Sequence, residues 1–236
     1  MCSEAFKATL TERIDRTIQQ LCKHHTPRVV VLAYDGHKNW RKQEYKDYKK
    51  GRKHESGVLK LFEYGQTHIR NHLCTLPCLE HHLHHDALEA DDFIHYIARH
   101  RTDPTTRIAI IANDHDYLPL LGDTNVRLFN LKTKNNELHL PINTITDERM
   151  TGDEYLLYKV LLGDKSDNIP AVFKRCGKKT AMKLVADPQK RQEQFDKGGE
   201  EALAKYTHNR LLIDNRCVPE PLQAQMDAQC SSVVEM

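Results

Sequence analysis

Eight carboxylates fall into four short clusters within the first two-thirds of the chain. They are Asp35, Glu89, Asp91, Asp92, Asp114, Asp116, Asp164 and Asp167. The first and third clusters follow apolar runs, and parallel-sheet folds place functional groups at the carboxyl ends of their strands. Carboxylates that converge on one spot repel each other and raise their own pKa values. A hard divalent cation with oxygen ligands removes that conflict, so the clusters predict a metal site that handles phosphate.

Each cluster also has an explanation that needs no metal. Asp114 and Asp116 could cap a helix, which taken alone is the better explanation. The three acids in 89–92 would favour the N-terminus of a helix through its dipole. Asp35 with the following glycine is a strong turn pair, and 164–167 could be a loop of side-chain turns. No one of these explanations covers all four clusters in this order.

Hydrophobic spacing predicts the elements that would position these acids. In the first part of the chain we expect a helix over 5–24, a strand at Val29–Tyr34, a helix at Val58–Leu73, a short strand at Cys78–His82, a helix at Glu89–His100, strands at Arg107–Ala112 and Val126–Leu131 with a helix at Tyr117–Leu121 between them, and a weak strand at Leu138–Leu140. This alternation is typical of an α/β sheet with helices on its faces. After Pro141 the pattern becomes helical, at Asp153–Leu162, Lys178–Ala186 and Gly199–Tyr206. We therefore expect a sheet domain over 1–150 and a smaller helical region over 151–236.

Size and composition fit an intracellular globular protein. The chain has 236 residues, of which 39% are hydrophobic and 29% charged. A membrane-spanning helix needs about 18 consecutive apolar residues, and the sequence has no such stretch. Its start lacks the apolar core of a signal peptide, and seven scattered cysteines suggest reduced thiols. We expect a cytoplasmic location and no membrane association.

Basic residues gather in two segments, although the net charge is only +2. The first segment runs from Lys38 to Lys60 and the second from Lys174 to Lys183. A solvated protein surface is the ordinary explanation for such runs. Beside an acidic metal site they favour a polyanionic partner, because cations hold its backbone while the metal acts on one phosphate.

The order of the acidic motifs resembles that of the 5′-nuclease superfamily of flap endonucleases and 5′–3′ exonucleases. The matching motifs are Tyr34-Asp35-Gly36, the Glu-Ala-Asp-Asp at 89–92, Asp114-His-Asp116, and the Gly-Asp-Lys-Ser-Asp-Asn-Ile-Pro at 163–170. The resemblance covers roughly residues 28–215. It implies a PIN-like three-layer α/β domain with a mainly parallel sheet, followed by a small helix–three-turn–helix region. Finer features at 48–56 and 209–219 resemble the phage branch, typified by the ribonuclease H of T-even phages.

Two further segments resemble nucleic-acid-binding parts of that superfamily. Arg41, Tyr45, Tyr48, Lys49 and Arg52 match its basic arch segment, here near 38–56. The resemblance implies that Lys49 and Arg52 grip the scissile phosphate while the tyrosines stack on bases. The run Gly177, Lys178, Lys179 and Thr180 resembles the duplex-binding turn, which would also hold a K⁺ ion. Bulky residues at 174–176 replace the first glycine of the usual pair, which puts those contacts in doubt.

The resemblance also implies a reaction and its partners. Two Mg²⁺ ions about 4 Å apart, with Mn²⁺ as a substitute, would hydrolyse a phosphodiester. The substrates would be branched or nicked duplex DNA and RNA–DNA hybrids, including the RNA primers of replication. The protein would act as a monomer, with a single-strand-binding protein or a sliding clamp as a partner. If a phage encodes the chain, its location is the host cytoplasm.

One motif of the superfamily has no counterpart in this sequence. The superfamily's first strand ends in a metal-binding Asp, and here Asp15 lies in an amphipathic helix instead. We therefore expect either a truncated start or a damaged site. The alternative function is a branched-DNA-binding protein with weak or no cleavage; a small PIN-like ribonuclease fits the loop at 163–170 less well. His81, His82, His84 and His85 could suggest zinc, but their spacing favours a surface cluster.

Overall fold

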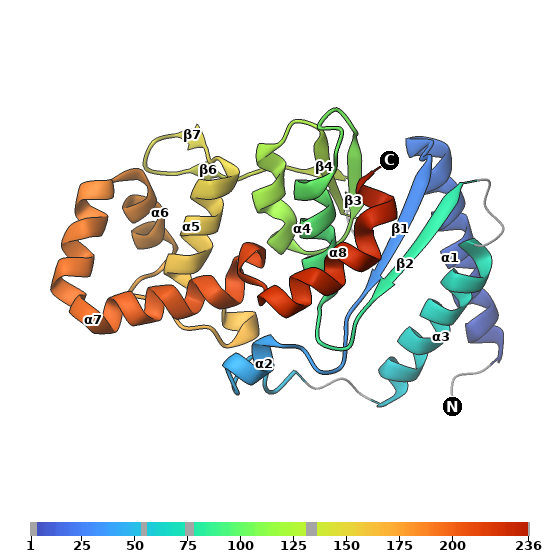
Figure 1. Ribbon diagram of the computed structural model, residues 1–236, viewed down its shortest axis with the longest axis horizontal. Helices are drawn as coiled ribbons and strands as arrows, with labels where there is room; N and C mark the ends of the chain where they lie inside the picture. Colours follow the sequence, from blue (N-terminus) through green and yellow to red (C-terminus); the bar gives the residue numbers. More distant parts are fainter. Residues whose placement is uncertain (1–3, 53–55, 74–77, 131–135, 236) are drawn as a thin grey trace. The chain divides into compact units, whose positions relative to one another are not determined.

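The chain divides into two compact units. The computed structural model describes residues 4–52, 56–73, 78–130 and 136–235. Unit 1 contains residues 1–32 and 51–83, and unit 2 contains residues 33–50 and 84–236. Figure 1 shows the order of the helices and strands along the chain. The candidate site lies within unit 2, so unit 1 is described briefly.

Unit 1 is built from two helices and a two-stranded sheet. Helices α1 (Glu4–His25) and α3 (Ser56–Leu73) lie side by side next to strands β1 (Val29–Tyr34) and β2 (Leu79–His84), whose last residues belong to unit 2 (Figure 1). All four elements were predicted, with bounds that shift by at most two residues at any end. Asp15 of α1 contacts His68 of α3 at 2.5 Å between Oδ1 and Nε2. That contact gives Asp15 a structural role between the two helices.

A three-stranded sheet carries the third acidic cluster of unit 2. Strand β3 (Ile108–Ile111) pairs in parallel with β4 (Val126–Asn130), which pairs antiparallel with β5 (Asn136–Leu138). The two parallel strands confirm the prediction, and the weak strand begins two residues earlier than we expected. Between β3 and β4 the predicted helix is a 3₁₀ helix, η1 (His115–Gly122), with Pro119 inside it. Proline lacks an amide N–H and cannot donate the regular helical hydrogen bond.

Helices on either side of residue 150 share one hydrophobic core. Helix α4 (Ala90–His100) precedes the sheet, and α5 (Gly152–Leu162), α6 (Lys178–Ala186), α7 (Pro188–Ile213) and α8 (Glu220–Val234) follow it. Leu128 of β4, Leu161 of α5 and Ala181 of α6 are fully buried in the same cluster. The short hairpin β6 (Ile142–Asn143) and β7 (Glu148–Arg149) connects the sheet to α5. Packing is therefore continuous across residue 150. The predicted boundary there, between a sheet domain and a helical region, stays a prediction.

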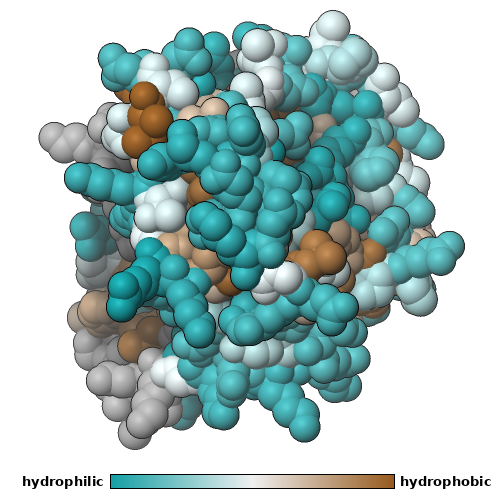
Figure 2. Space-filling view, turned by 90° about the vertical axis from the view of Figure 1, so that its left-hand side faces the viewer, coloured by the Kyte–Doolittle hydropathy of each residue, from teal (hydrophilic) through white to brown (hydrophobic). Residues whose placement is uncertain are grey.

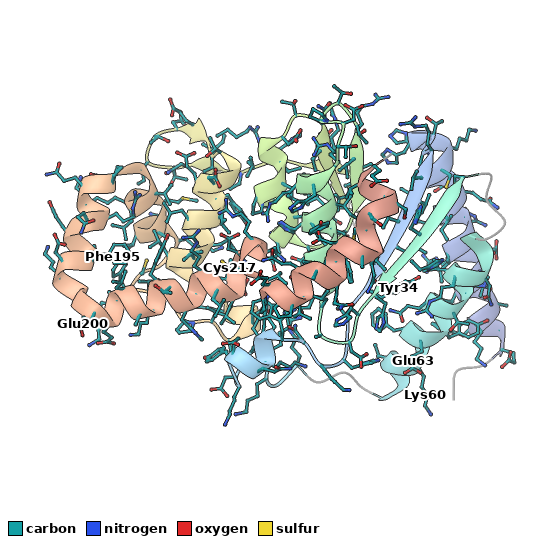
Figure 3. All side chains as sticks on the ribbon, in the orientation of Figure 1. Tyr34, Lys60, Glu63, Phe195, Glu200 and Cys217 are labelled. Atoms are coloured by element: carbon teal, nitrogen blue, oxygen red, sulfur yellow. The ribbon has the colours of Figure 1, made fainter. Side chains whose placement is uncertain are left out.

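The longest helical stretches that were not predicted lie in α7 and α8. The first turns of α7 before Gly199 are rich in charged and polar residues, so they carry a weak apolar pattern. Phe195 nevertheless contacts Phe173 and Tyr206 with its ring edge, and Figure 3 shows it where α7 faces the interior. Helix α8 also has a weak apolar stripe, and Tyr96 of α4 contacts Asp227 on it. Both stretches are helices because of tertiary packing more than sequence periodicity.

The basic segment contributes aromatic side chains to the core. Trp40 and Tyr48 are 3% and 4% exposed on either side of the short helix α2 (Arg41–Glu44). Tyr48 belongs to a second small core with Ile169 and Leu212. The segment is low in aliphatic residues, but aromatic rings bury large apolar areas on their own.

The face of unit 2 that α6 and α7 form is largely polar. Figure 2 shows the end of unit 2 formed by α6 and α7 as mostly hydrophilic, with small separate hydrophobic spots. Among these residues Leu203 of α7 is 58% exposed. Across the described residues, the helices lack the combination of length and apolarity that crossing a bilayer requires.

The buried side chain of Asn209 connects two backbone segments, and removing it should destabilise the fold. Its side chain is 1% exposed, and Nδ2 donates to the carbonyl oxygens of Val160 (3.0 Å) and Pro170 (2.7 Å). Replacing it with alanine leaves two buried carbonyls without this donor, which costs roughly 2–3 kcal/mol. Chemical denaturation should show this loss for Asn209→Ala, whereas exposed Thr207→Ala on the same helix should change stability by less than about 0.5 kcal/mol. Equal stability of the two variants would contradict the assigned role.

Candidate metal centre

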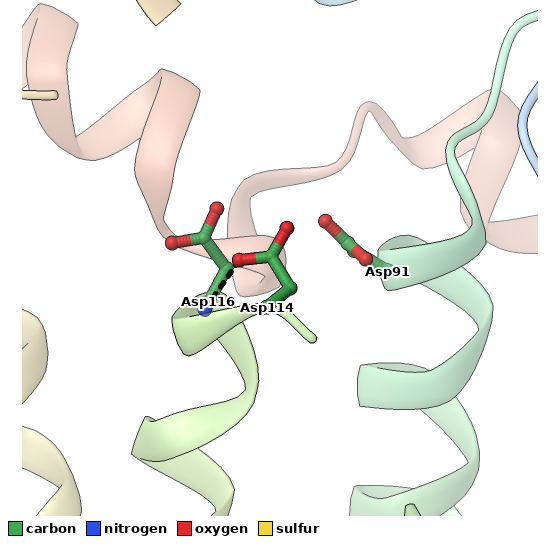
Figure 4. Close-up of side chains that lie close together, drawn as sticks. All are labelled: Asp91, Asp114 and Asp116. Atoms are coloured by element: carbon green, nitrogen blue, oxygen red, sulfur yellow. Dashed lines mark hydrogen bonds between the residues drawn. The ribbon is translucent and has the colours of Figure 1, made fainter. Parts of the chain in front are cut away.

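Three of the predicted acids lie together at one edge of the parallel strands. Asp91 is in the first turn of α4, Asp114 follows β3 and caps η1, and Asp116 is in the first turn of η1. Each offers a carboxylate oxygen, and these atoms all lie within 4.8 Å of one another. Figure 4 shows the carboxylates of Asp91 and Asp114 facing each other, and the amide of Asp116 donating to Asp114 Oδ1 at 3.0 Å. Capping of a helix by Asp114 and clustering of the acids were alternative explanations of this motif, and the structure shows both.

The electrostatics of this group fit a hard divalent cation. Burial, together with the charges of Asp116 and Asp114, raises the pKa of Asp91 to about 7, although the Tyr117 hydroxyl donates to its carboxylate. Burial likewise raises the pKa of Asp116 above its ordinary value. Half-exposed carboxylate oxygens that repel each other are the ligands that Mg²⁺ and Mn²⁺ prefer. The residues present therefore fit a metal ion at this position.

His95 contacts the backbone of Asp116 and the ring of Tyr117. Sequence reasoning missed this residue. It is fully buried in α4, where its ring stacks on Tyr117 and its Nε2 lies 3.0 Å from the carbonyl oxygen of Asp116. Burial lowers the pKa of His95 to about 3, so the ring stays neutral. The signal in the sequence is the spacing: His95 follows Asp91 by four residues, which puts both on one helical face.

Glu89 and Asp92 have basic partners of their own. Arg41 is 2% exposed, and its guanidinium donates to Glu89 Oε2 (3.1 Å), to both oxygens of Asp92 (2.8 and 3.1 Å) and to the carbonyl oxygen of Leu212 (2.8 Å). Asp92 also accepts from the amide of Glu89 at 2.9 Å, in a capping box. Burial would raise the pKa of Glu89, but Lys49 and Arg41 outweigh it and hold that pKa below its ordinary value. We predicted Arg41 as a nucleic-acid contact; its buried position corrects that prediction, because its donors face inward.

Lys49 and Tyr48 also contact Glu89. The Lys49 ammonium pairs with Glu89 Oε1 at 19% side-chain exposure, and the Tyr48 hydroxyl donates to Oε2 at 2.9 Å. Buried Tyr48 is therefore not placed to stack on a base, as we had expected. Lys49 has a positive φ of 54°, a backbone conformation that is uncommon for residues other than glycine. These contacts place Lys49 next to the acids at the start of α4.

Asp35 lies at the same helix start. It is exposed, and its Oδ1 accepts a hydrogen bond from the amide of Ala90, the first residue of α4, at 2.9 Å. Gly36 permits this approach, since a Cβ there would lie 2.2 Å from the carbonyl oxygen of His85. Asp35 is thus near Asp91 but outside the group of three.

Asp164 and Asp167 occupy the loop that enters the helical region. Asp164 pairs with Lys159 of α5, which also lies 3.0 Å from Asp116. Asp167 is 6% exposed in the short helix η3 (Lys165–Asp167), and its backbone carbonyl accepts from the amide of Lys49 at 3.1 Å. The role of both acids as metal ligands stays a prediction. Sequence reasoning missed Lys159, whose signal is one cation within the apolar run 155–162.

Of the remaining predicted nucleic-acid contacts, Tyr45 packs against the protein and those at the start of α6 are exposed. The Tyr45 hydroxyl donates to the Asn168 carbonyl at 3.1 Å, and its ring meets His208 edge-on. Gly177 caps α6, and Lys178, Lys179 and Thr180 are exposed in the first turn of that helix. Arg52 belongs to unit 1, and its role at a phosphate stays a prediction.

Comparison with known proteins identifies the family. Residues 4–151 match the family described as the 5′-3′ exonuclease, N-terminal resolvase-like domain. The chain belongs to this 5′–3′ exonuclease family. It is 29% identical over 179 residues to the flap endonuclease Xni of Shewanella baltica (strain OS155), covering 75% of this chain and 64% of that protein. It is 30% identical over 190 residues to the Xni of Shewanella piezotolerans, covering 78% and 68%.

Similarity extends to one part of a polymerase and to phage structures. The chain is 30% identical over 177 residues to DNA polymerase I of Caldicellulosiruptor bescii, of which it covers 20%. It aligns with the crystal structure of the T5 D15 protein with metal ions at a TM-score of 0.69 and 20% identity, covering 95% of this chain and 91% of that one. That likeness confirms the PIN-like α/β fold. The chain spans slightly less than two thirds of the first Xni relative, and the T-even branch and the preceding metal-binding Asp stay predictions.

Asp91 generates a prediction about pH. Its raised pKa means that its contribution to folding stability is present below about pH 4 and is lost as pH rises through 7. In EDTA, Asp91→Asn should therefore be more stable than the wild type at pH 8, by ~1–2 kcal/mol, and the gain should shrink towards pH 5. Urea denaturation at both pH values measures this, with exposed Asp196→Asn as the control. If Asp91→Asn were more stable than the wild type by the same amount at both pH values, the Asp91 charge would already be compensated in the wild type.

Proposed function

We propose that this chain is a divalent-metal-dependent phosphodiester hydrolase that acts as a 5′–3′ exonuclease and flap endonuclease. The observation that carries the proposal is the group Asp91, Asp114 and Asp116, whose oxygens lie within 4.8 Å of one another in a member of the 5′–3′ exonuclease family. Helix caps alone do not require three carboxylates to face one point. The substrate class that fits best is branched or nicked duplex DNA and RNA–DNA hybrids, including RNA primers.

The chain's own residues would hold the metal and orient the phosphate. Asp91, Asp114 and Asp116 would hold a divalent ion, Mg²⁺ with Mn²⁺ as a substitute. Such an ion lowers the pKa of a water ligand and stabilises charge that develops on the phosphate. Tyr117 and neutral His95 fix the positions of Asp91 and Asp116, which keeps the oxygens in place. Attack of a water oxygen on the phosphorus would break the P–O3′ bond, leaving a 5′-phosphate on one product and a 3′-hydroxyl on the other.

Lys49 is the group that would contact the scissile phosphate. Its ammonium lies beside Glu89, at the start of the helix that carries Asp91, and is partly exposed. A phosphate near the acid group would attract the ammonium away from Glu89, which keeps its bonds from Arg41 and Tyr48. A role for Arg52 at the phosphate rests on the family resemblance alone.

Duplex backbone would bind at the start of α6. Exposed Lys178 and Lys179 follow the cap residue Gly177, where a helix N-terminus presents amide groups to phosphate. The T5 D15 flap endonuclease, which shares this fold, has been crystallised in a complex with DNA and metal ions. A K⁺ ion at this turn, a monomeric state, a clamp or single-strand-binding partner and a cytoplasmic location belong to the same proposal.

The metal-dependent reaction is tested with a labelled 5′-flap substrate. Wild-type protein should cleave it with Mg²⁺ and not in EDTA, and Asp114→Asn should lose at least about 100-fold in rate. Exposed Asp196→Asn, which changes the net charge equally, should retain activity. Tight flap binding without product at high Mg²⁺ would instead favour a branched-DNA-binding protein.

Lys49 is tested by separating binding from cleavage. Lys49→Ala should slow single-turnover cleavage by about 10- to 100-fold, while flap affinity falls by less than about threefold, because a phosphate contact strengthened in the transition state affects the chemical step most. Lys50→Ala is the matched control, since exposed Lys50 pairs with Asp47 and carries the same charge. An equal loss of affinity and rate in Lys49→Ala would assign it to binding alone.

A further inference from the structure

Lys159 is a cation placed inside the acidic site. It lies on α5 between the buried residues Tyr158 and Val160, and its side chain is 14% exposed. Its ammonium lies 3.0 Å from Asp116 Oδ1 and contacts Asp164 Oδ2. Burial alone would lower the pKa of Lys159, but the two carboxylates raise it above its ordinary value. The ammonium is therefore charged at neutral pH.

Asp164 is held in place by its surroundings. Its Oδ1 accepts from the amide (2.8 Å) and the hydroxyl (2.6 Å) of Ser166, while Oδ2 faces Lys159. Its backbone pairs with Ile169 through two hydrogen bonds of 2.9 and 2.8 Å. Gly163 has a φ of +71°, and a Cβ there would lie 2.4 Å from the Ile169 carbonyl oxygen. The loop therefore presents Asp164 to Lys159 in one orientation.

Asp116 is shared between two cationic positions. One side of it faces Asp91 and Asp114, which form the proposed divalent site, and the other side faces Lys159. A second divalent ion between Asp116 and Asp164 would have to take the oxygens that Lys159 contacts. The ammonium is covalently attached to the same chain, so it competes for these oxygens at a high effective concentration.

We propose that the Lys159 ammonium stands in for a second divalent ion between Asp116 and Asp164. The chain then binds one divalent ion tightly, at Asp91, Asp114 and Asp116, and takes a second ion only by displacing Lys159. This inference rests on the proposed metal site and replaces the expectation of two equivalent Mg²⁺ ions. Lys159 acts as a positioning residue: it neutralises Asp164 and orients Asp116.

Counting bound Mn²⁺ tests the inference without any activity measurement. Electron paramagnetic resonance of free Mn²⁺, confirmed by titration calorimetry, should give one tight site in the wild type at pH 8. Lys159→Met should gain a second site whose affinity is at least about tenfold higher than in the wild type, because two carboxylates lose their resident cation. Lys159→Arg keeps the charge and should bind one ion. Lys165→Met removes an exposed lysine of the same loop and should also bind one ion.

The outcomes separate this inference from the proposed function. Two sites of similar affinity in the wild type, or an unchanged count in folded Lys159→Met, would overturn the role of Lys159 while leaving the metal site intact. Failure of the wild type to bind any Mn²⁺ would overturn both. If Lys159→Met does not fold, the wild-type count and the Lys159→Arg count decide, because a one-ion stoichiometry in both supports the inference and two ions in either one overturns it.

Discussion

Mutual repulsion of carboxylates is the constraint on which the site depends. Seven of the eight predicted acids lie at or near the ends of α4, β3 and α5, and each needs a compensating partner. The structure supplies partners for several of them: Arg41 for Asp92, Lys49 and Arg41 for Glu89, and the Ala90 amide for Asp35. Lys159 compensates Asp164. Asp91, Asp114 and Asp116 remain as a group of like charges, although Asp116 also contacts Lys159, and burial together with the charges of Asp116 and Asp114 raises the pKa of Asp91.

The same partners join segments that are far apart in the sequence. Arg41 links the start of α4 to the end of α7, where the Leu212 carbonyl accepts from it. Asn168, in a left-handed conformation, donates to the carbonyl oxygens of Asp47 (2.9 Å) and Lys50 (2.7 Å). Tyr48, Ile169 and Leu212 pack together below these polar contacts. Site geometry and core packing are therefore two aspects of one set of contacts.

The sequence predicted the parts of this arrangement that are local. Apolar spacing located α1, α3, α4 and α6 and the strands β1, β3 and β4, because each has a regular hydrophobic pattern. Motif order identified the acids and the family. Partner choice could not be predicted in the same way: Arg41 looked like a surface cation, and only its burial next to Asp92 assigns it to the interior. The weak patterns of α7 and α8 likewise concealed helices that tertiary contacts stabilise.

The hydrogen bond between Arg41 and the Leu212 carbonyl also determines when the acid network can form during translation. The acceptor for the Arg41 Nε lies 171 residues further along the chain than its donor. A nascent chain therefore contains all of the acids long before it contains the carbonyl that helps to fix Arg41 between Glu89 and Asp92. Contacts of such long sequence separation form late in folding. The fully compensated acid network is thus assembled only after the chain has been synthesised through Leu212.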